Sequence, residues 1–596
     1  MSFNYLGQFD QTLESSAAIT WAVESSGPTH DPEGNRSHLL DINGGILGGQ
    51  LFVNWTYNEN IHRRKTIEWL ANSYATSLRR LIELCRSREA VGLTPWDFPE
   101  AELTQAELDQ LLHLDRPPGE SPARLQPGNV VDLYILSPTQ EGMLFHSIYA
   151  PEADVYLRQT GWRLKGMLDV AALEHALQAL VDRHTALRTS FIWGESDKVL
   201  QVVERRVKVT LEQHDWQGLS TDEQREKLEK FLAADRRQGF DLTTAPLMRL
   251  ILVRLGSDDY QFIWTYHHLV LDGWARSEIH KELFMLYEAA RENRSLQLAA
   301  PHPYREYIAW LRRQDMTKAE EFWRQTLEGF PSPPALSIDR GALGSLSNDE
   351  GYGEVFAVLS EEDTANLNAL AHQQQLTINT LVQGAWAMIL SCYSGERDIV
   401  FGATVSGRPP ELPGIETMVG VFLNTLPVRV LVLPDERLIA WLRNLQQQQL
   451  LMRQYEYTPL AQIKRWSKTP RTIPLFENIL VLENYPVETS FIEREQDLHF
   501  SGPYFAQLYH YPLALTVQTG AQIYLHTPYS RARFSDVDVR QLLERLKLLL
   551  QNVAASASHP EWTVRDLMLC LLDEENPGDV ASRLEVQDDA ESHFAF

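Results

Sequence analysis

Two adjacent histidines lie at the centre of a short polar cluster, residues 266–274 (YHHLVLDGW). His267 and His268 are followed by Asp272 and Gly273, after an apolar run typical of a buried strand. An imidazole titrates in the range useful for accepting or positioning a proton, and a glycine lets the backbone approach a ligand closely. A polar cluster at the end of a core strand can hold reacting groups rigidly. The same residues are also compatible with two hydrogen-bonded core histidines and a turn aspartate.

The composition is that of a globular protein and excludes several classes. The 596 residues predict about three to five domains. The net charge of −26, with no long basic run, disfavours nucleic-acid binding. Three widely separated cysteines predict neither a disulfide framework nor a metal site. No signal peptide and no apolar stretch long enough to span a membrane is visible, so we expect a cytoplasmic protein without a membrane partner.

The two ends of the chain share one pattern. An alternating strand at residues 50–57 precedes a helix whose apolar residues recur at helical spacing, and the same order recurs from residue 522. The offset between matching positions is constant, since 522 − 50 and 550 − 78 are both 472. A shared register without gaps indicates an internal repeat. The N-terminal piece would then be the closing unit of a related domain, without a counterpart of the histidine pair.

Strands and helices alternate along most of the chain, which predicts a mixed α/β fold. We expect a closing unit over residues 1–100, a proline- and glycine-rich linker over 101–130, and two lobes over 131–310 and 311–573. Residues 574–596 are acidic and aperiodic, and we expect them to be disordered.

The histidine cluster matches a family signature, His-His-x-x-x-Asp-Gly, from His267 to Gly273. Residues 131 to about 570 resemble a condensation domain of a non-ribosomal peptide synthetase. Five further family motifs appear in the family's order, at residues 137–145, 183–191, 304–310, 419–429 and, as a looser match, 455–460. Residues 2–85 resemble the C-terminal segment of the epimerization domains of the same superfamily, in agreement with the repeat.

The resemblance implies a fold and a reaction. The family fold is two chloramphenicol-acetyltransferase-like lobes in a V-shaped pseudo-dimer, with the active site in a central tunnel. The reaction is aminolysis: the amine of an acceptor aminoacyl thioester attacks a donor peptidyl or aminoacyl thioester. The implied partners are upstream donor and downstream acceptor peptidyl carrier proteins and other synthetase modules. The substrates arrive on their 4′-phosphopantetheine arms, and no bound cofactor is implied.

Within the signature we assign roles to three residues. We expect His268 to accept the proton of the attacking amine or to orient that amine, and the residues alone do not choose between the two. The N–H of Gly273 is a candidate oxyanion donor. His267 is assigned either to direct catalysis or to local structure.

Supporting residues are expected around the signature. Asp272 should pair with an arginine. Arg188 is the preferred candidate and Arg429 is the second. Asn424 is either a hydrogen-bonding group near the tunnel or a structural loop amide, and Trp274 is expected to pack.

Two other functions remain open. The chain could be another enzyme of the same superfamily, either an epimerase or an acyltransferase. It could also be a non-catalytic remnant that only docks carrier proteins. The upstream epimerization-like segment and the amino-acid sequence of residues 137–146 favour a donor that ends in a D-residue.

Overall fold

The computed structural model describes residues 1–8, 38–47, 50–86, 93–112, 125, 127–149, 156–193, 198–330, 332–333, 335–341, 351–470, 472–483, 498–507, 511–569 and 571. The chain divides into two compact units, Met1–Leu93 and Thr94–Phe596, and each is described by itself. The acidic tail 574–596 lies outside the described residues, as does much of the expected linker.

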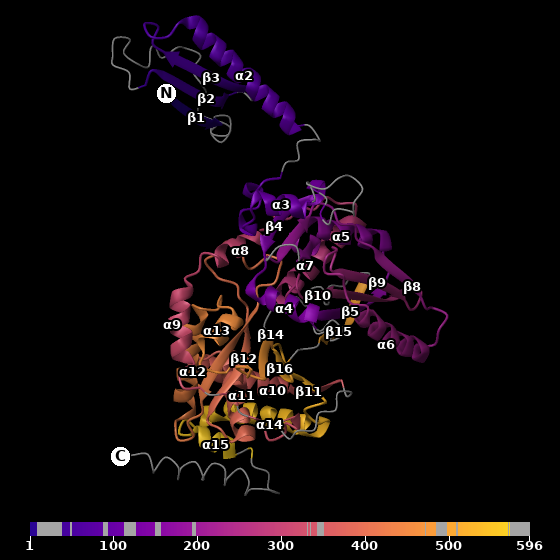
Figure 1. Cartoon of the computed structure of the whole chain (residues 1–596). Helices are drawn as coiled ribbons and strands as arrows, with labels where there is room; N and C mark the ends of the chain where they lie inside the picture. Colours follow the sequence, from indigo (N-terminus) through magenta and orange to yellow (C-terminus); the bar gives the residue numbers. More distant parts are fainter. Residues whose placement is uncertain are drawn as a thin grey trace, which may run out of the picture. The chain divides into compact units, whose positions relative to one another are not determined.

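The first unit is a small sheet with one helix (Figure 1). Strands β1 (Ser2–Gln8) and β2 (Leu40–Leu47) are parallel, and β3 (Gln50–Tyr57) is antiparallel to β2. Helix α2 (Arg64–Arg86) follows, and its Tyr74 ring lies 5.9 Å from the ring of Trp55 on β3. Ile67 is buried and Tyr74 faces the sheet, as the helical spacing predicts, whereas Leu81 near the end of the helix is 57% exposed.

The structure confirms the internal repeat. In the second unit, β14 (Asn478–Glu483) is parallel to β16 (Leu513–Gln518), which is antiparallel to β17 (Ile523–Ser530), and α14 (Asp536–Ala555) follows. Ser2 pairs with Asp41 in the first copy and Asn478 pairs with Leu513 in the second. Leu513 lies 513 − 41 = 472 positions after Asp41, so β2 and β16 keep the offset, and β1 and β14 take equivalent places as their parallel neighbours.

The first lobe of the second unit is built on a five-stranded sheet of order β15-β5-β10-β9-β8. Its strands are β5 (Leu157–Gly166), β8 (Leu211–Asp215), β9 (Met248–Arg254), β10 (Asp259–His267) and β15 (Leu498–Gln507). Strand β10 lies in the middle. Its Phe262, Trp264 and Tyr266 join one buried cluster and Ile263 joins another, so both faces of the strand are covered. This explains why apolar residues stand side by side at positions 262–264 instead of alternating with polar ones.

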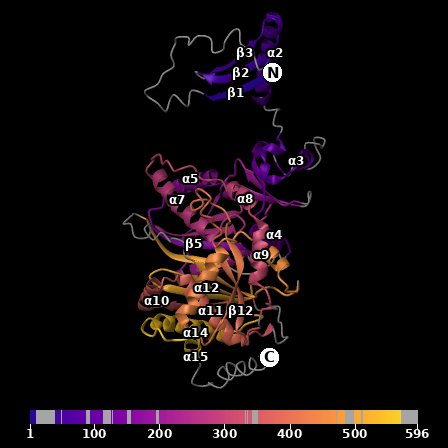
Figure 2. The same ribbon diagram turned by 90° about the vertical axis from the view of Figure 1, so that its left-hand side faces the viewer.

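Helices cover the sheet of the first lobe and a smaller sheet adjoins it. The helices are α4 (Pro138–Tyr149), α5 (Val170–Arg183), α6 (Thr221–Arg237), α7 (Gly273–Arg291) and α8 (Arg305–Leu311). The smaller sheet has the order β4-β7-β6, with β4 (Val130–Ile135), β6 (Thr189–Ile192) and β7 (Leu200–Glu204). Figures 1 and 2 show α5 and α7 side by side, and together they bury the apolar face of β10.

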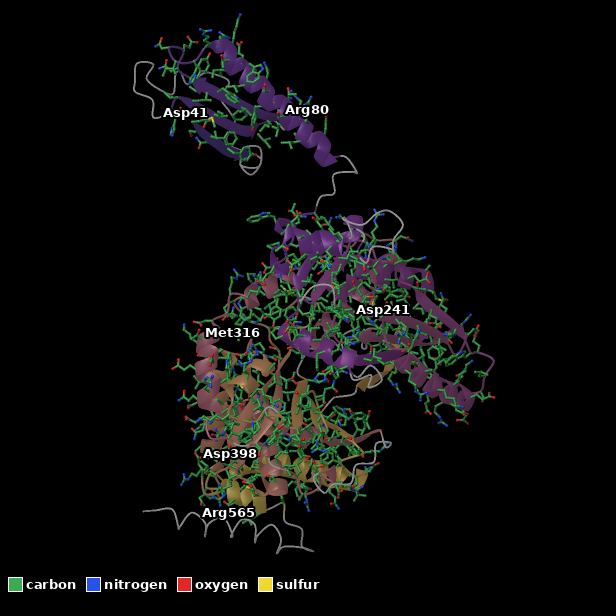
Figure 3. The ribbon with its side chains drawn as sticks, viewed as in Figure 1. Asp41, Arg80, Asp241, Met316, Asp398 and Arg565 are labelled. Carbon is green, nitrogen blue, oxygen red and sulfur yellow. The ribbon has the colours of Figure 1, made fainter. Side chains whose placement is uncertain are left out.

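The second lobe contains a six-stranded sheet of order β11-β17-β16-β14-β12-β13. Its remaining strands are β11 (Tyr352–Leu359), β12 (Asp398–Val405) and β13 (Asn424–Leu431). Its helices are α9 (Met316–Thr326), α10 (Glu361–Gln374), α11 (Ile378–Ser394), α12 (Leu438–Arg453), α13 (Leu460–Trp466), α14 and α15 (Val564–Leu569). Helix α11 is buried along nearly its whole length, and α10 and α14 pack against it. Figure 3 shows how densely side chains fill this lobe, where Asp398 is labelled.

Two of the expected boundaries were wrong. Strand β15 follows the second lobe's elements in sequence but pairs with β5, so it belongs to the sheet of the first lobe. Residues 94–100 do not belong to the closing unit and residues 101–112 are not linker. The buried Phe98 and Leu108 and helix α3 (Gln105–Leu111) belong to the second unit, where Arg312 pairs with Glu100 at 2.7 Å. An apolar pattern predicts that a segment is buried, but it does not say which neighbour covers the segment.

Candidate active site

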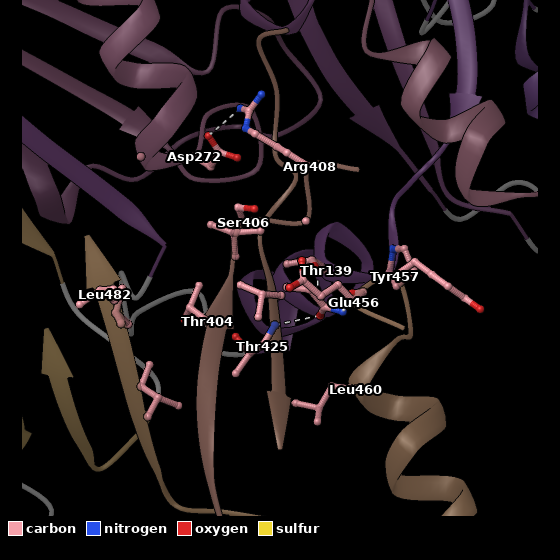
Figure 4. A pocket seen from close by; sticks show the side chains of 18 of the residues that line it. Thr139, Asp272, Thr404, Ser406, Arg408, Thr425, Glu456, Tyr457, Leu460 and Leu482 are labelled. Carbon is pink, nitrogen blue, oxygen red and sulfur yellow. Dashed lines mark hydrogen bonds and ion pairs between the residues drawn. The ribbon is translucent and has the colours of Figure 1, made fainter. Parts of the chain in front are cut away.

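A cavity of about 1980 Å³ lies between the two lobes of the second unit. Its walls include His268, Asp272 and Gly273 from the first lobe. The second lobe contributes residues 404–411 and 423–425, part of α12, and the loop between α12 and α13. Figure 4 shows residues from both lobes around this space. We call residues 266–274 the histidine loop and residues 454–460 the glutamate loop.

His268 is half-buried on the cavity wall, and its tautomer is fixed. Its Nδ1 lies 2.6 Å from the carbonyl oxygen of Leu271. Because a carbonyl only accepts, Nδ1 carries the proton and Nε2 keeps a lone pair. Burial, and next the Arg158 guanidinium, lower the pKa of His268 well below its usual value. The ring is therefore neutral near pH 7, suited to accept a hydrogen bond from an amine rather than to retain a proton.

His267 is buried and is not part of the cavity wall. Its Nδ1 accepts the N–H of Leu269 at 3.2 Å, so its Nε2 carries the proton and faces Ser147 Oγ at 3.4 Å. Burial, with a smaller contribution from Arg158, lowers the pKa of His267 to about 3. Both ring nitrogens face hydrogen-bonding partners within the protein, so the geometry favours the structural role over direct catalysis.

Asp272 pairs with Arg408, and the predicted pairing with Arg188 or Arg429 was wrong. Asp272 Oδ1 lies 3.3 Å from Arg408 Nη2, and both side chains are about 95% buried. Its carboxylate also accepts the N–H of Ala275 at 2.7 Å and that of Phe422 at 3.0 Å. Asp272 is thus the N-cap of α7 and joins this helix to residues of the second half of the chain.

The two arginines that were expected at Asp272 serve other places. Arg188 donates to the carbonyl oxygens of Val181 and Glu204, on the far end of α5 and on β7. Arg429 forms a bidentate pair with Asp398 at 2.9 and 2.7 Å, between neighbouring strands β13 and β12. Arg408 was the better candidate because it lies in an irregular loop, free to reach across, whereas Arg429 lies in a strand whose register pairs it with β12.

Gly273 and Trp274 begin helix α7 beside the cavity. The first N–H groups of a helix lack intrahelical acceptors, and among the described residues the Gly273 N–H forms no hydrogen bond. This N–H is therefore still our candidate for the oxyanion donor. The Trp274 Nε1–H donates to Glu416 O at 2.8 Å, and the Arg408 guanidinium lies 5.7 Å from its ring.

Three of the family motifs, at residues 137–145, 304–310 and 419–429, meet behind the histidine loop. Gln140 of α4 is buried, and its side-chain amide donates to Leu269 O and pairs with Gln201, each at 2.9 Å. Tyr304 donates to Val421 O at 2.5 Å, which fixes the segment that Asp272 also holds. These motifs thus form one support around the loop rather than several sites.

Asn424 combines the two alternatives considered for it. It lines the cavity, and its Nδ2 donates to the carbonyl oxygens of Glu456 at 2.8 Å and Thr458 at 2.7 Å. Its Oδ1 lies 3.4 Å from Thr139 Oγ1 on α4, so it bridges the two lobes. The amide is thus a structural group that fixes the glutamate loop.

Two residues of the cavity were missed from the sequence. Arg158 on β5 sets the positive field at both histidines, and Glu456 is the central carboxyl of the glutamate loop. The sequence places each of them far from the signature, and the only signal was that Glu456 lies in the loosest of the matched motifs.

Among the residues that the structure describes, no group of three or more His, Cys, Asp or Glu side chains is arranged to hold a metal ion. None of the described helices is both long and apolar enough to cross a bilayer.

The comparisons with known proteins agree with the motifs. The family model named "Condensation domain" matches residues 130–575. One of the proteins that make up the linear gramicidin synthase of Brevibacillus parabrevis is 41% identical over 556 residues, which are 93% of this chain and 7% of that protein. A component of the mycosubtilin synthase of Bacillus subtilis is 33% identical over 94% of this chain and 21% of its own length. The chain therefore spans a small part of the curated relatives it matches.

Solved structures share the fold. The starter condensation domain of rhizomide synthetase RzmA has a TM-score of 0.62 at 18% identity, over 73% of this chain and 96% of that one. The X-domain from teicoplanin biosynthesis has a TM-score of 0.62 at 24% identity, over 75% of this chain and 99% of that one. The predicted α/β fold of two lobes is confirmed. With the family model covering most of its length, the chain belongs to the condensation-domain family of the non-ribosomal peptide synthetases.

Proposed function

We propose that this chain joins a donor peptidyl or aminoacyl thioester to an acceptor aminoacyl thioester through an amide bond, both substrates being held on carrier proteins by 4′-phosphopantetheine arms. The observation that carries the proposal is the fixed tautomer of His268 on the wall of the cavity between the lobes. Its Nε2 lone pair is available to an N–H of the acceptor amine, which orients the nitrogen toward the donor carbonyl.

The reaction needs little from the protein beyond orientation and charge stabilisation. An α-amine has a pKa of about 7.7–8.0, so part of it is neutral at cellular pH. The tetrahedral intermediate carries an oxyanion, for which the Gly273 N–H at the N-terminus of α7 is our candidate donor. The donor thiolate then leaves and the amine loses a proton. No acyl-enzyme is required in this scheme.

A donor ending in a D-residue is the second part of the proposal. The first unit has the same strand order and helix as the end of the second lobe, and its sequence resembles the end of an epimerization domain. An epimerizing domain upstream of a condensation domain would deliver D-configured donors. Matched donors that differ only in this stereocentre test the proposal, and faster amide formation with the L-donor would count against it.

A reconstitution tests the reaction itself. Two carrier proteins, one loaded with a donor peptide and one with an acceptor amino acid, are mixed with the chain, and the amide is detected by mass spectrometry. We expect product with the wild type and about 10²-fold less with His268→Ala, the cost of a misplaced nucleophile. His146→Ala is a matched control, because this cavity-lining histidine lies outside the signature. Absence of product with the wild type would favour the alternative that the chain only docks carrier proteins. Equal product with His268→Ala would contradict the role assigned to His268.

A further inference from the structure

Glu456 is a carboxyl on the cavity wall to which the reaction described above gives no role. It lies in the glutamate loop, between α12 and α13, on the second lobe. Figure 4 shows its side chain among those that line the cavity, in the same view as the Asp272–Arg408 pair.

The backbone of the glutamate loop is held firmly. Asn424 donates to the carbonyl oxygens of Glu456 and Thr458, and the Thr458 side chain is fully buried. The ring of Tyr455 stacks on that of Phe322, with centroids 4.5 Å apart. A residue on so constrained a backbone presents its side chain in a defined place, which is what a binding group requires.

The carboxyl itself has few partners. It accepts a backbone hydrogen bond from Gly407, and among the described residues it forms no ion pair within 4 Å. A carboxylate has room for about four hydrogen bonds. Burial raises the pKa of Glu456 to about 7, while Arg453 and the Gly407 N–H act in the opposite direction. A desolvated carboxyl without a counter-ion is costly unless a ligand supplies one.

The charges elsewhere in the cavity determine what that ligand is. Arg158 contributes positive charge at both histidines, and the charge of Arg408 is paired with that of Asp272. An ammonium group is therefore disfavoured beside the imidazole of His268. Asp272 is not available either, because its side chain is only 4% exposed and its charge is already paired with Arg408. Glu456 keeps acceptor capacity and, unlike the exposed Glu411 of the same cavity, is largely shielded from solvent.

We propose that the Glu456 carboxylate binds the α-ammonium group of the acceptor aminoacyl thioester and takes one proton from it. The proton moves from the ammonium nitrogen to a carboxylate oxygen, which leaves a neutral amine and a carboxylic acid, and no bond to carbon changes in this step. The amine then donates a hydrogen bond to His268 Nε2 and attacks the donor. This inference rests on the proposed condensation function. The proton affinities of the two groups are close, because the pKa of Glu456 is about 7 and that of an α-amine is about 7.7–8.0.

Binding of two acceptor analogues tests the inference without requiring turnover. One analogue is an aminoacyl pantetheine with an amide in place of the thioester, and the other is its des-amino form. By calorimetry, we expect the wild type to bind the amine at least about tenfold more tightly, the effect of one charge-assisted hydrogen bond. E456Q keeps the shape and an acceptor for the Gly407 N–H, and it should bind both analogues equally. E411Q, at an exposed carboxyl of the same cavity, should retain the preference.

Kinetics separate this inference from the proposed function. In the condensation assay, E456Q should raise the KM for the acceptor about tenfold or more and leave the KM for the donor unchanged. If the wild type forms no amide, the proposed function fails while the calorimetric preference still decides the role of Glu456. No preference in the wild type, or the same preference in E456Q, would overturn the inference. Should E456Q lose its cooperative thermal transition, E456D provides the same comparison, with a preference that is retained in part.

Discussion

The histidine loop of the first lobe and the glutamate loop of the second face the same cavity but are fixed in different ways. In the histidine loop the side chains of His267 and Asp272 are consumed by internal hydrogen bonds, and His268 exposes one lone pair. In the glutamate loop the neighbours hold the backbone, and the carboxyl of Glu456 is left for a ligand. The first loop is locked through its side chains and the second through its main chain. Substitutions should therefore affect stability more in the first loop and ligand binding more in the second.

The strongest way to break the histidine loop is Asp272→Asn. It removes the negative charge from a buried pair and leaves the Arg408 guanidinium unpaired, which costs about 3–5 kcal/mol in the free energy of unfolding. Chemical denaturation should show the loss. Asp398→Asn, which breaks the half-exposed pair with Arg429, is the control and should cost about 1 kcal/mol or less. Similar losses for both variants would contradict the assignment of Asp272 as the lock.

A smaller but still large loss of stability is expected for Gly407→Ala. Gly407 links the two loops, because its N–H binds Glu456 and the next residue, Arg408, pairs with Asp272. Gly407 has φ +61°, and an added Cβ would lie 1.8 Å from Phe422 O. The left-handed conformation alone costs about 1–2 kcal/mol for an L-residue, and the overpacking adds about 1–3 kcal/mol. Thermal unfolding measures the sum. Gly218→Ala, where nothing lies within 4 Å of the new atom, should be nearly neutral.

Asn424→Ala should loosen the glutamate loop without unfolding the lobe. It deprives two carbonyl oxygens of a donor, so we expect a loss of about 1–3 kcal/mol. Because the loop then holds Glu456 less firmly, the KM for the acceptor should rise. Hydrogen exchange should increase at residues 455–458, and unchanged exchange there would show that other contacts suffice.

The smallest effect is a change in the pH dependence of stability at His267. Its folded pKa is about 3 and the unfolded value is about 6.5, so as pH falls below 6.5 the unfolded chain binds a proton that the folded chain does not. Stability is therefore lost toward acid by about 1.4 kcal/mol per pH unit from this residue. His267→Asn removes a titrating group, so denaturation between pH 6.5 and 5 should show a shallower slope. An unchanged slope would mean that His267 is protonated in the fold.

Local patterns predicted the elements of the site and missed its long-range partners. The strand before His267, helix α5 and the internal repeat follow from periodicity and were confirmed. The Asp272–Arg408 pair joins residues 136 positions apart, and nothing in the spacing of either segment specifies the other. The lowered pKa of His268 results first from burial in the fold and next from Arg158, which lies on β5, the strand that pairs with β10. The expectation that an imidazole would titrate in its ordinary range failed for this reason.

Strand β15 has a consequence for how the two lobes can move or be separated. It comes from the second half of the chain but forms the edge of the first lobe's sheet, paired with β5 from Leu498 to Gln507. Separating the lobes must therefore either carry β15 along with the first lobe or break its ladder with β5. A first lobe that ends before α9 would leave β5 as an unpaired edge, the kind of surface on which sheets aggregate. Engineers who exchange lobes between related domains should therefore transfer β15 together with the first lobe and not with the second.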